Sequence, residues 1–234
     1  VFVEKPPAED LEQAQEMFEV SRQTSRILMV GFMKRFAQKY VMARKIADRE
    51  EFGRPTHLLL RYSFNTGPDR RGFLAGMGAH PFDLARYFMG DYRSLHPLWG
   101  ESAEGLVLSL NCTFSNGGTG TIVMNSQAPA VVERLELTGQ GTMVVVDDIA
   151  TLEHYPRAGQ RWRAPRKEVR RPNMALQTEE NSSLVLQGYA GEVCEFVDAV
   201  REGRRPRTAT IEDGVALMRL VELLSGGENE IIEL

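Results

Sequence analysis

Five segments between residues 56 and 147 alternate apolar and polar side chains with a period of about two. They are residues 56–64, 105–114, 119–125, 131–138 and 142–147. This period predicts strands that bury one face, and the run Asn116-Gly117-Gly118 is typical of a hairpin turn. Helical periodicity precedes the strands at 37–49 and follows them at 184–202 and 211–224. The order predicts an α+β domain with an open, mainly antiparallel sheet and helices on one face.

A different pattern occupies the first part of the chain. Residues 1–3 form a short apolar segment, residues 11–25 have a helical pattern, and residues 27–31 are apolar again. Strand, helix and strand at this spacing form a βαβ unit with parallel strands. One such unit cannot cover both faces of its own sheet. We therefore expect residues 1–34 to be the remnant of a parallel α/β domain, and residues 35–234 to form a second domain.

Residues 71–90 combine a cluster of glycines with a helical pattern that ends at Gly90. The glycines are Gly72, Gly76 and Gly78. They predict a loop that can approach a ligand closely, and Pro81 suits the first turn of the helix that follows. His80 then lies at the helix N-terminus, whose dipole disfavours imidazolium, so its ring can accept a proton. The negative charge of Asp83 acts in the opposite direction, because it favours the protonated His80 ring. The alternative is a histidine that only caps the helix or packs against it.

Charge and cysteine content narrow the classes of partner. The formal net charge of −4 gives no general reason to expect nucleic acid or an anionic membrane. Residues 148–180 predict loops with room for one hairpin, and the basic run at 157–171 within them suits a solvated loop. Cys112 and Cys194 are isolated and match no metal-binding spacing, which favours a reduced, cytoplasmic protein without a metal. The sequence contains no run of about 18 apolar residues, so it predicts no membrane span.

Four groups of short motifs follow one another in a recognisable order. They are Val3-Glu4-Lys5-Pro6, the run VGFMKRF at 30–36, the run GAHPFD at 78–83, and the closing segments 189–196, 203–206 and 210–214. Together they resemble the glucose–fructose oxidoreductase and inositol dehydrogenase family (Gfo/Idh/MocA). The resemblance implies a two-domain NAD(P)-dependent oxidoreductase. A Rossmann domain comes first, and a domain built on an open sheet then holds the substrate and mediates oligomerisation.

Chains of this family begin with a glycine-rich dinucleotide-binding loop. This sequence has none, since Gly117-Gly118 and Gly139-Gln140-Gly141 lie between strand patterns. By analogy with the usual Rossmann domain, about 90 to 100 residues precede this stretch in the parent protein. We therefore expect NAD or NADP as the cofactor of the parent, and no activity from these 234 residues alone.

The resemblance assigns catalytic and cofactor-binding roles. His80 matches the catalytic histidine of the family, and Lys5 matches the lysine of the Glu-Lys-Pro motif. Near a nicotinamide and partly desolvated, Lys5 would have a lowered pKa and could polarise an alcohol oxygen or help to pass its proton. Glu4 would contact the ribose, and Pro6 would shape the turn, with a cis bond as one option. An ordinary exposed lysine is the alternative for Lys5.

Three further residues are candidates for substrate binding. Arg35, Asp83 and Tyr189 could face the substrate, although a surface arginine and a core aromatic are the alternatives for the first and third. One position departs from the family pattern, because many members carry aspartate where this sequence has Gly76. That aspartate would orient the histidine or bind a substrate hydroxyl. Asp69 or Asp83 could substitute for it.

These observations leave three interpretations. In the first, the parent is an oxidoreductase that acts on a sugar, cyclitol or related polyol. In the second, the parent is a non-catalytic ligand-binding or regulatory protein on the same scaffold. The third concerns the chain itself, which would be only a substrate-domain and dimerisation fragment. The sheet face away from the helices is expected to carry the following residues or their alternates: Leu58, Leu60, Tyr62, Leu108, Leu110 and Val123. Such a face is too apolar to leave in water, which predicts a homodimer or homotetramer through it.

Overall fold

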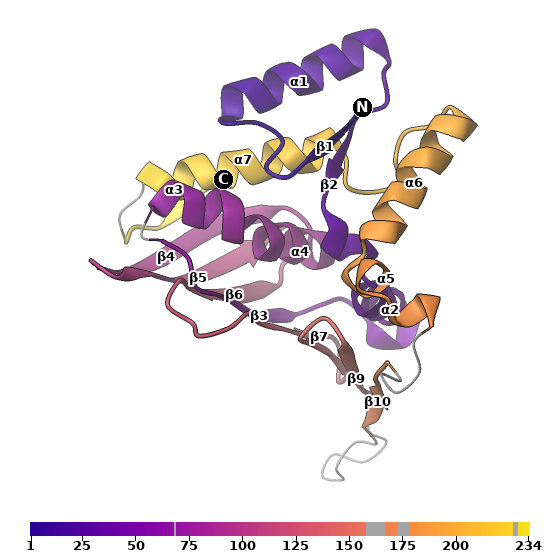
Figure 1. Cartoon of the computed structure of the whole chain (residues 1–234). Coiled ribbons are helices and arrows are strands. Elements are labelled where there is room, and N and C mark those ends of the chain that lie inside the picture. The colour runs from indigo at the N-terminus through magenta and orange to yellow at the C-terminus, as the bar shows by residue number, and fades with distance from the viewer. Residues whose placement is uncertain (68, 158–166, 173–177, 227–228) are drawn as a thin grey trace.

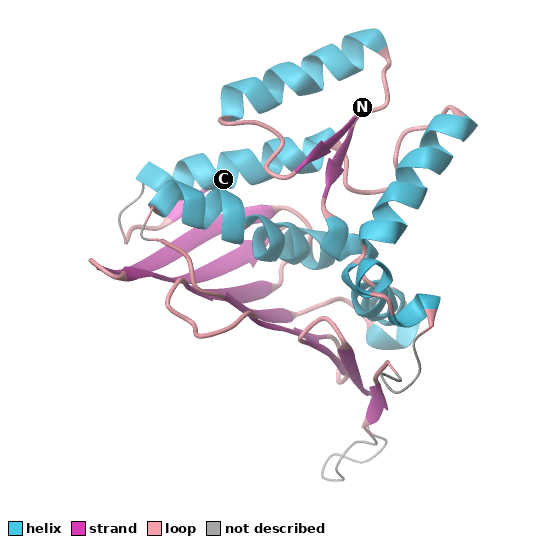
Figure 2. Cartoon of the chain, in the orientation of Figure 1, coloured by secondary structure: helices cyan, strands magenta, loops and turns pink. Residues whose placement is uncertain are grey.

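The computed structural model describes residues 1–67, 69–157, 167–172, 178–226 and 229–234 (Figure 1). A twisted nine-stranded sheet dominates these residues. Helices cover one face of the sheet and leave the other open (Figure 2). The predicted α+β class is therefore confirmed.

All but one of the neighbouring strand pairs in this sheet are antiparallel; β3 and β6 run parallel. In spatial order the strands are β10 (Glu168–Arg170), β9 (Thr151–Tyr155), β8 (Met143–Asp147), β7 (Val132–Thr138), β3 (His57–Ser63), β6 (Thr119–Asn125), β5 (Gly105–Phe114), β4 (Tyr92–Ser102) and β11 (Ile232–Glu233). The β5–β6 hairpin turns through residues 115–118, as its Asn-Gly-Gly sequence predicts.

The alternation of each strand divides its residues between the two faces, and of the two sets that we expected for the open face it is largely the alternates that lie there. The buried side of the sheet holds Leu58, Leu60, Tyr62, Leu108 and Leu110, with exposures of 0 to 6%. Their alternates Leu59, Arg61 and Val107 lie on the open face, together with Val123 as expected. A period of two fixes which residues share a face, whereas helix packing decides which face is covered.

The covering helices supply the other side of the core. They are α2 (Gln38–Ala47), α4 (Ala79–Met89), α7 (Ile211–Gly226) and the short turns η1 (Met33–Phe36) and η2 (Glu50–Phe52). The central helix α4 packs on β3, on β6 and on α7. Phe82, Leu84 and Phe88 of α4 are at most 3% exposed. Burying each such side chain contributes about 1.5 to 3 kcal/mol, so α4 is anchored firmly in the fold.

The glycine-rich stretch before α4 is helical, and the predicted loop was wrong. It consists of α3 (Arg70–Gly72) and a π-helical turn, η3 (Phe73–Met77), that leads into α4. Phe73 and Met77 are both 1% exposed, so apolar burial outweighs the helix-breaking tendency of the glycines. Gly78 serves close packing, because a Cβ there would lie 2.4 Å from the carbonyl oxygen of Leu74.

The N-terminal βαβ unit is present as predicted. β1 (Phe2–Glu4) and β2 (Met29–Gly31) pair in parallel, with α1 (Leu11–Thr24) between them. Asp10 caps α1 by accepting a hydrogen bond of 2.8 Å from the Gln13 amide. On the other edge of β2, Met29 bridges to Thr210. The unit is thus packed against the start of α7.

Other boundaries differ from the sequence expectations. The predicted helix at 184–202 is two helices, α5 (Ser183–Gln187) and α6 (Tyr189–Glu202), which follow the turn η4 (Glu179–Asn181). They are separated at Gly188, whose φ is 100°. β4 and β11 were not predicted. Within 148–180, β9 and β10 pair as the anticipated hairpin; residues 158–166 and 173–177, including much of the basic run, lie outside the described residues.

Candidate active site

Lys5 follows β1 at the carboxyl edge of the small parallel sheet. Its ammonium donates a hydrogen bond of 2.9 Å to the main-chain carbonyl of Gly76, in the turn before α4. Partial burial lowers the pKa of Lys5, and the charge of Lys34 acts in the same direction against that of Glu4. A lysine in this setting gives up a proton more readily than one in water.

His80 lies in the first turn of α4, as the sequence predicts, and is 9% exposed. Its ring packs edge-on against Tyr62, with 5.7 Å between the ring centroids. Burial lowers the pKa of His80 well below its ordinary value, and the charges of Lys5 and Lys34 lower it further. The imidazole is therefore neutral near pH 7 and can accept a proton, in agreement with the sequence expectation.

The two predicted catalytic residues come together from opposite ends of a long sequence interval. Lys5 is held by Gly76, which lies one helical turn before His80. The charge of Lys5 contributes, after burial, to the lowered pKa of His80. The arrangement places a proton acceptor beside a cation that can polarise an oxygen.

Arg35 and Asp83 bind one another inside the protein. The Arg35 guanidinium donates to both Asp83 oxygens at 2.6 to 3.1 Å, and Arg35 also reaches Asp213 of α7 at 3.0 Å. Arg35 and Asp83 are each 5% exposed. Their pairing joins η1, α4 and α7, which fixes the helix that carries His80. Contact of either residue with substrate stays a prediction.

Neither proposed substitute for the missing family aspartate reaches His80. Asp69 accepts a hydrogen bond of 2.6 Å from the Gly72 amide and so caps α3, while Asp83 is held by Arg35. Nδ1 of His80 is buried, and none of the described residues forms a hydrogen bond with it. A Cβ built at Gly76 would meet nothing within 4 Å, so the place of the aspartate is open space.

The remaining predicted residues surround this centre. Glu4 ends β1 and its carboxylate lies against Gly31, 3.0 Å from where a Cβ would be. The Lys5–Pro6 bond is cis, as anticipated, and Pro6 lines an open cleft of about 760 Å³. Tyr189 begins α6, is 37% exposed, and is close enough to raise the pKa of Tyr62 together with burial and Glu133. Binding of cofactor or substrate by these residues stays a prediction.

Three buried polar residues near the site escaped the sequence analysis. Lys34 forms an ion pair with Glu133. Glu192 of α6 is 2% exposed, and its Oε2 finds no hydrogen-bond partner among the described residues. A signal for Glu133 was available, because it shares the period of Leu135 and Leu137 on the buried face of β7. Glu192 lies seven residues before Ala199, the other buried residue of α6, so one face of that helix carries both.

Metal-binding clusters and membrane-spanning helices are both absent from the described residues. No group of three or more His, Cys, Asp or Glu side chains there could hold a metal ion. No helix in the same residues combines the length and the hydropathy that crossing a bilayer requires.

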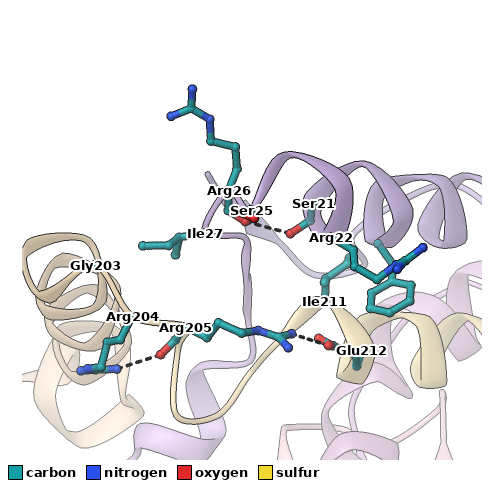
Figure 3. A pocket seen from close by; sticks show the side chains of 11 residues that line it. Ser21, Arg22, Ser25, Arg26, Ile27, Gly203, Arg204, Arg205, Ile211 and Glu212 are labelled. Carbon is teal, nitrogen blue, oxygen red and sulfur yellow. Dashed lines mark hydrogen bonds and ion pairs between the residues drawn. The ribbon is translucent and has the colours of Figure 1, made fainter.

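A separate cavity of about 390 Å³ lies between α1 and the segment that links α6 to α7 (Figure 3). None of the predicted site residues lines it. The guanidinium of Arg205 pairs with Glu212, that of Arg204 pairs with Glu195, and the side chain of Arg26 points away from the cavity (Figure 3). Two of its cations are thus already paired, and we place the active site elsewhere.

Comparisons with known proteins agree with the motifs. Residues 40–145 match the family model of the GFO/IDH/MocA C-terminal domain. The uncharacterized oxidoreductase YrbE of Bacillus subtilis is 27% identical over 165 residues, which are 63% of this chain and 48% of that protein. The scyllo-inositol 2-dehydrogenase (NAD(+)) of the same organism is 32% identical over 97 residues, 38% of this chain and 28% of the relative. The chain thus spans about half or less of these relatives.

Solved structures share the fold. A dehydrogenase from Chromobacterium violaceum superposes with a TM-score of 0.84 at 24% identity, over 95% of this chain and 67% of that one. A levoglucosan dehydrogenase in complex with NADH and levoglucosan gives the same TM-score at 16% identity. The match covers 100% of this chain and 73% of the neighbour. These neighbours, both below 25% identity, show the fold, and the match of residues 40–145 to the family model bears out the resemblance inferred from the motifs.

Proposed function

We propose that the protein to which these residues belong is an NAD(P)-dependent oxidoreductase that acts on a sugar, a cyclitol or a related polyol. One observation carries the proposal: a buried, neutral His80 stands beside a partly desolvated Lys5 at the carboxyl edge of parallel strands. That edge is where doubly wound sheets bind dinucleotides. The inositol dehydrogenases among the relatives and the NADH-bound levoglucosan dehydrogenase among the neighbours support the substrate class.

The residues present fit the nicotinamide end of such a cofactor. Glu4 and Lys5 project from the end of β1, beside β2, whereas the sequence has no glycine-rich loop for the pyrophosphate. We accordingly assign residues 1–34 to the end of a dinucleotide-binding domain and residues 35–234 to the substrate domain. When bound, the nicotinamide supplies the hydride acceptor.

The chemistry of the chain itself concerns the proton and the oxygen. Oxidation of a secondary alcohol leaves a hydroxyl proton to be removed. His80 accepts that proton, because its neutral ring has a free nitrogen. Lys5 donates a hydrogen bond to the alcohol oxygen and stabilises the charge that develops on it. The Arg35–Asp83 pair keeps α4, and so His80, in place.

Turnover by the full-length parent tests this assignment. With NAD or NADP and a panel of inositols and sugars, His80→Ala and Lys5→Ala are each expected to lower kcat by about two orders of magnitude or more. His57→Ala is the control, because His57 is exposed on β3 and bonds only to Thr119 in the described contacts. Unchanged turnover in either site variant would remove that residue from the mechanism.

A second function has one observation in its favour. Within the part of the chain that the structure describes, no carboxylate bonds to Nδ1 of His80, and position 76 offers no side chain to do so. A ligand-binding or regulatory protein on the same scaffold would have no need of that orientation. Calorimetry separates the two functions: a polyol that binds the parent and its cofactor without any change in NADH absorbance supports the non-catalytic one.

We also propose that the parent assembles through the open face of the sheet and works in the cytoplasm. Leu59 on that face is 39% exposed, and Val123 lies beside it. Cys112 and Cys194 are both free, as in a reducing compartment.

A further inference from the structure

Lys34 is a buried cation at the base of the site. It lies in η1, and its side chain is 7% exposed. Its ammonium pairs with one oxygen of Glu133, on β7, and the other oxygen accepts a hydrogen bond of 2.6 Å from the Tyr40 hydroxyl. Three elements therefore hold this cation in one place.

The same cation faces the catalytic centre. The Lys34 ammonium lies 5.6 Å from the centroid of the Tyr62 ring, and the edge of that ring packs against His80. Contact thus runs from Glu133 through Lys34 and Tyr62 to His80. Because little water separates them, charges here act over longer distances than at the surface.

A buried ion pair is weak evidence for stability, since well-packed apolar residues often replace one without loss. The Lys34–Glu133 pair therefore invites a role in the chemistry. The charge of Lys34 lowers the pKa of both Lys5 and His80, after the larger effect of burial. These are the two residues to which we assign the reaction.

We infer that Lys34 is a positioning residue of this site: Glu133 holds its ammonium over Tyr62, so that a fixed positive charge lies next to the ring that packs against His80. The role of His80 as a base rests on the proposed function. The interaction between Lys34 and His80 does not, and can be measured in the absence of cofactor and substrate.

Other charged groups around His80 act differently. Lys5, beyond β1, lowers the pKa of His80 more than Lys34 does, after the larger effect of burial. Asp83 on α4 is neutralised by Arg35, which also binds Asp213 of α7. Glu133 on β7 is paired with Lys34, and it is not among the groups that shift the pKa of His80.

The test is a pH titration of His80 by NMR in the 234-residue chain, with the His80 signal assigned by its loss in His80→Gln. Lys34→Met is expected to raise the titration midpoint of His80 by about one pH unit, because a nearby cation is removed. Lys34→Arg should keep the midpoint close to wild type. Lys39→Met is the matched control, since Lys34 and Lys39 are each 5% exposed as whole residues but Lys39 is not among the groups that act on Lys5 or His80.

Lys34→Met leaves Glu133 buried without its partner, so Lys34→Met/Glu133→Gln provides a variant without the uncompensated charge. It is also expected to raise the His80 midpoint, because Lys34 is the member of the pair that acts on the ring. An unchanged midpoint in whichever of these two variants folds, or the same rise in Lys34→Arg, would overturn the inference. A shifted midpoint combined with a parent that oxidises no polyol would instead leave the inference standing and refute the proposed function.

Discussion

The ammonium of Lys5 and the main-chain carbonyl of Gly76 are joined by a hydrogen bond of 2.9 Å. This bond ties the end of β1 to the π-helical turn that leads into His80. Because the acceptor belongs to the main chain, Lys5 is placed without help from a side chain at position 76. The departure from the family aspartate therefore leaves the lysine in position and removes only the group that would have oriented the histidine.

Gly76 is expected to tolerate a side chain, whereas Gly188 is not. Gly76 lies in a helical turn with open space around it, so Gly76→Ala should raise the free energy of unfolding by about 0.5 to 1 kcal/mol. Gly188 has a φ of 100°, and a Cβ there would lie 2.0 Å from the Met33 carbonyl oxygen. Gly188→Ala should cost about 2 kcal/mol or more. Urea denaturation of the 234-residue chain measures the free energy of unfolding of both variants. Equal changes in the two would contradict the different roles given to Gly76 and Gly188.

The parts of the fold that the sequence predicts are those that local pattern controls. The alternation around Leu58 and Leu60 identifies β3 wherever the helices lie, and Pro81 marks the first turn of α4. The place of His80 in the first turn of α4 is predicted from its neighbour Pro81. A pattern of this kind needs no knowledge of distant segments.

The errors arise where tertiary contacts decide. Burial of Phe73 and Met77 makes helix of a glycine-rich stretch that would otherwise form a loop. Gly188 ends α5 because the chain passes close to Met33, far away in the sequence. The pairing of Lys34 with Glu133 joins residues that no local pattern relates. Period alone also could not decide which sheet face the helices cover.

Glu192 should make stability fall as pH rises. Burial, with a contribution from Glu4, raises the pKa of Glu192 to about 8 from an ordinary value of 4.5. Between these values the folded carboxyl holds a proton that the unfolded chain has lost, so the free energy of unfolding decreases through this window. Glu192→Gln removes the effect.

The comparison of wild type with Glu192→Gln at pH 5 and pH 8.5 checks this in urea. Between pH 5 and pH 8.5, Glu192→Gln should lose less free energy of unfolding than wild type, by on the order of 1 kcal/mol. This difference allows for the screening of the carboxyl by solvent. Glu4→Gln should reduce the slope partly, because one source of repulsion is gone. Parallel pH profiles for wild type and Glu192→Gln would show that the folded carboxyl is ionised.

The open sheet face is expected to hold two copies of the chain together. Leu59, Val107 and Val123 form its apolar centre, over a shallow hollow of about 370 Å³ bordered by Arg61, Arg134 and Glu136. An interface of the usual size buries about 800 Å² on each partner, which an area of several strands can supply. A two-fold axis through it would bring each apolar centre against its copy. Sedimentation at micromolar concentration should therefore give a dimer or tetramer.

Val123→Asp should give monomers, because it places a charge in the centre of the interface. Val193→Asp is the control, since Val193 is 52% exposed on α6, away from the sheet. A wild-type monomer at high concentration, or a Val123→Asp variant that sediments like wild type, would show that the copies do not meet on this face.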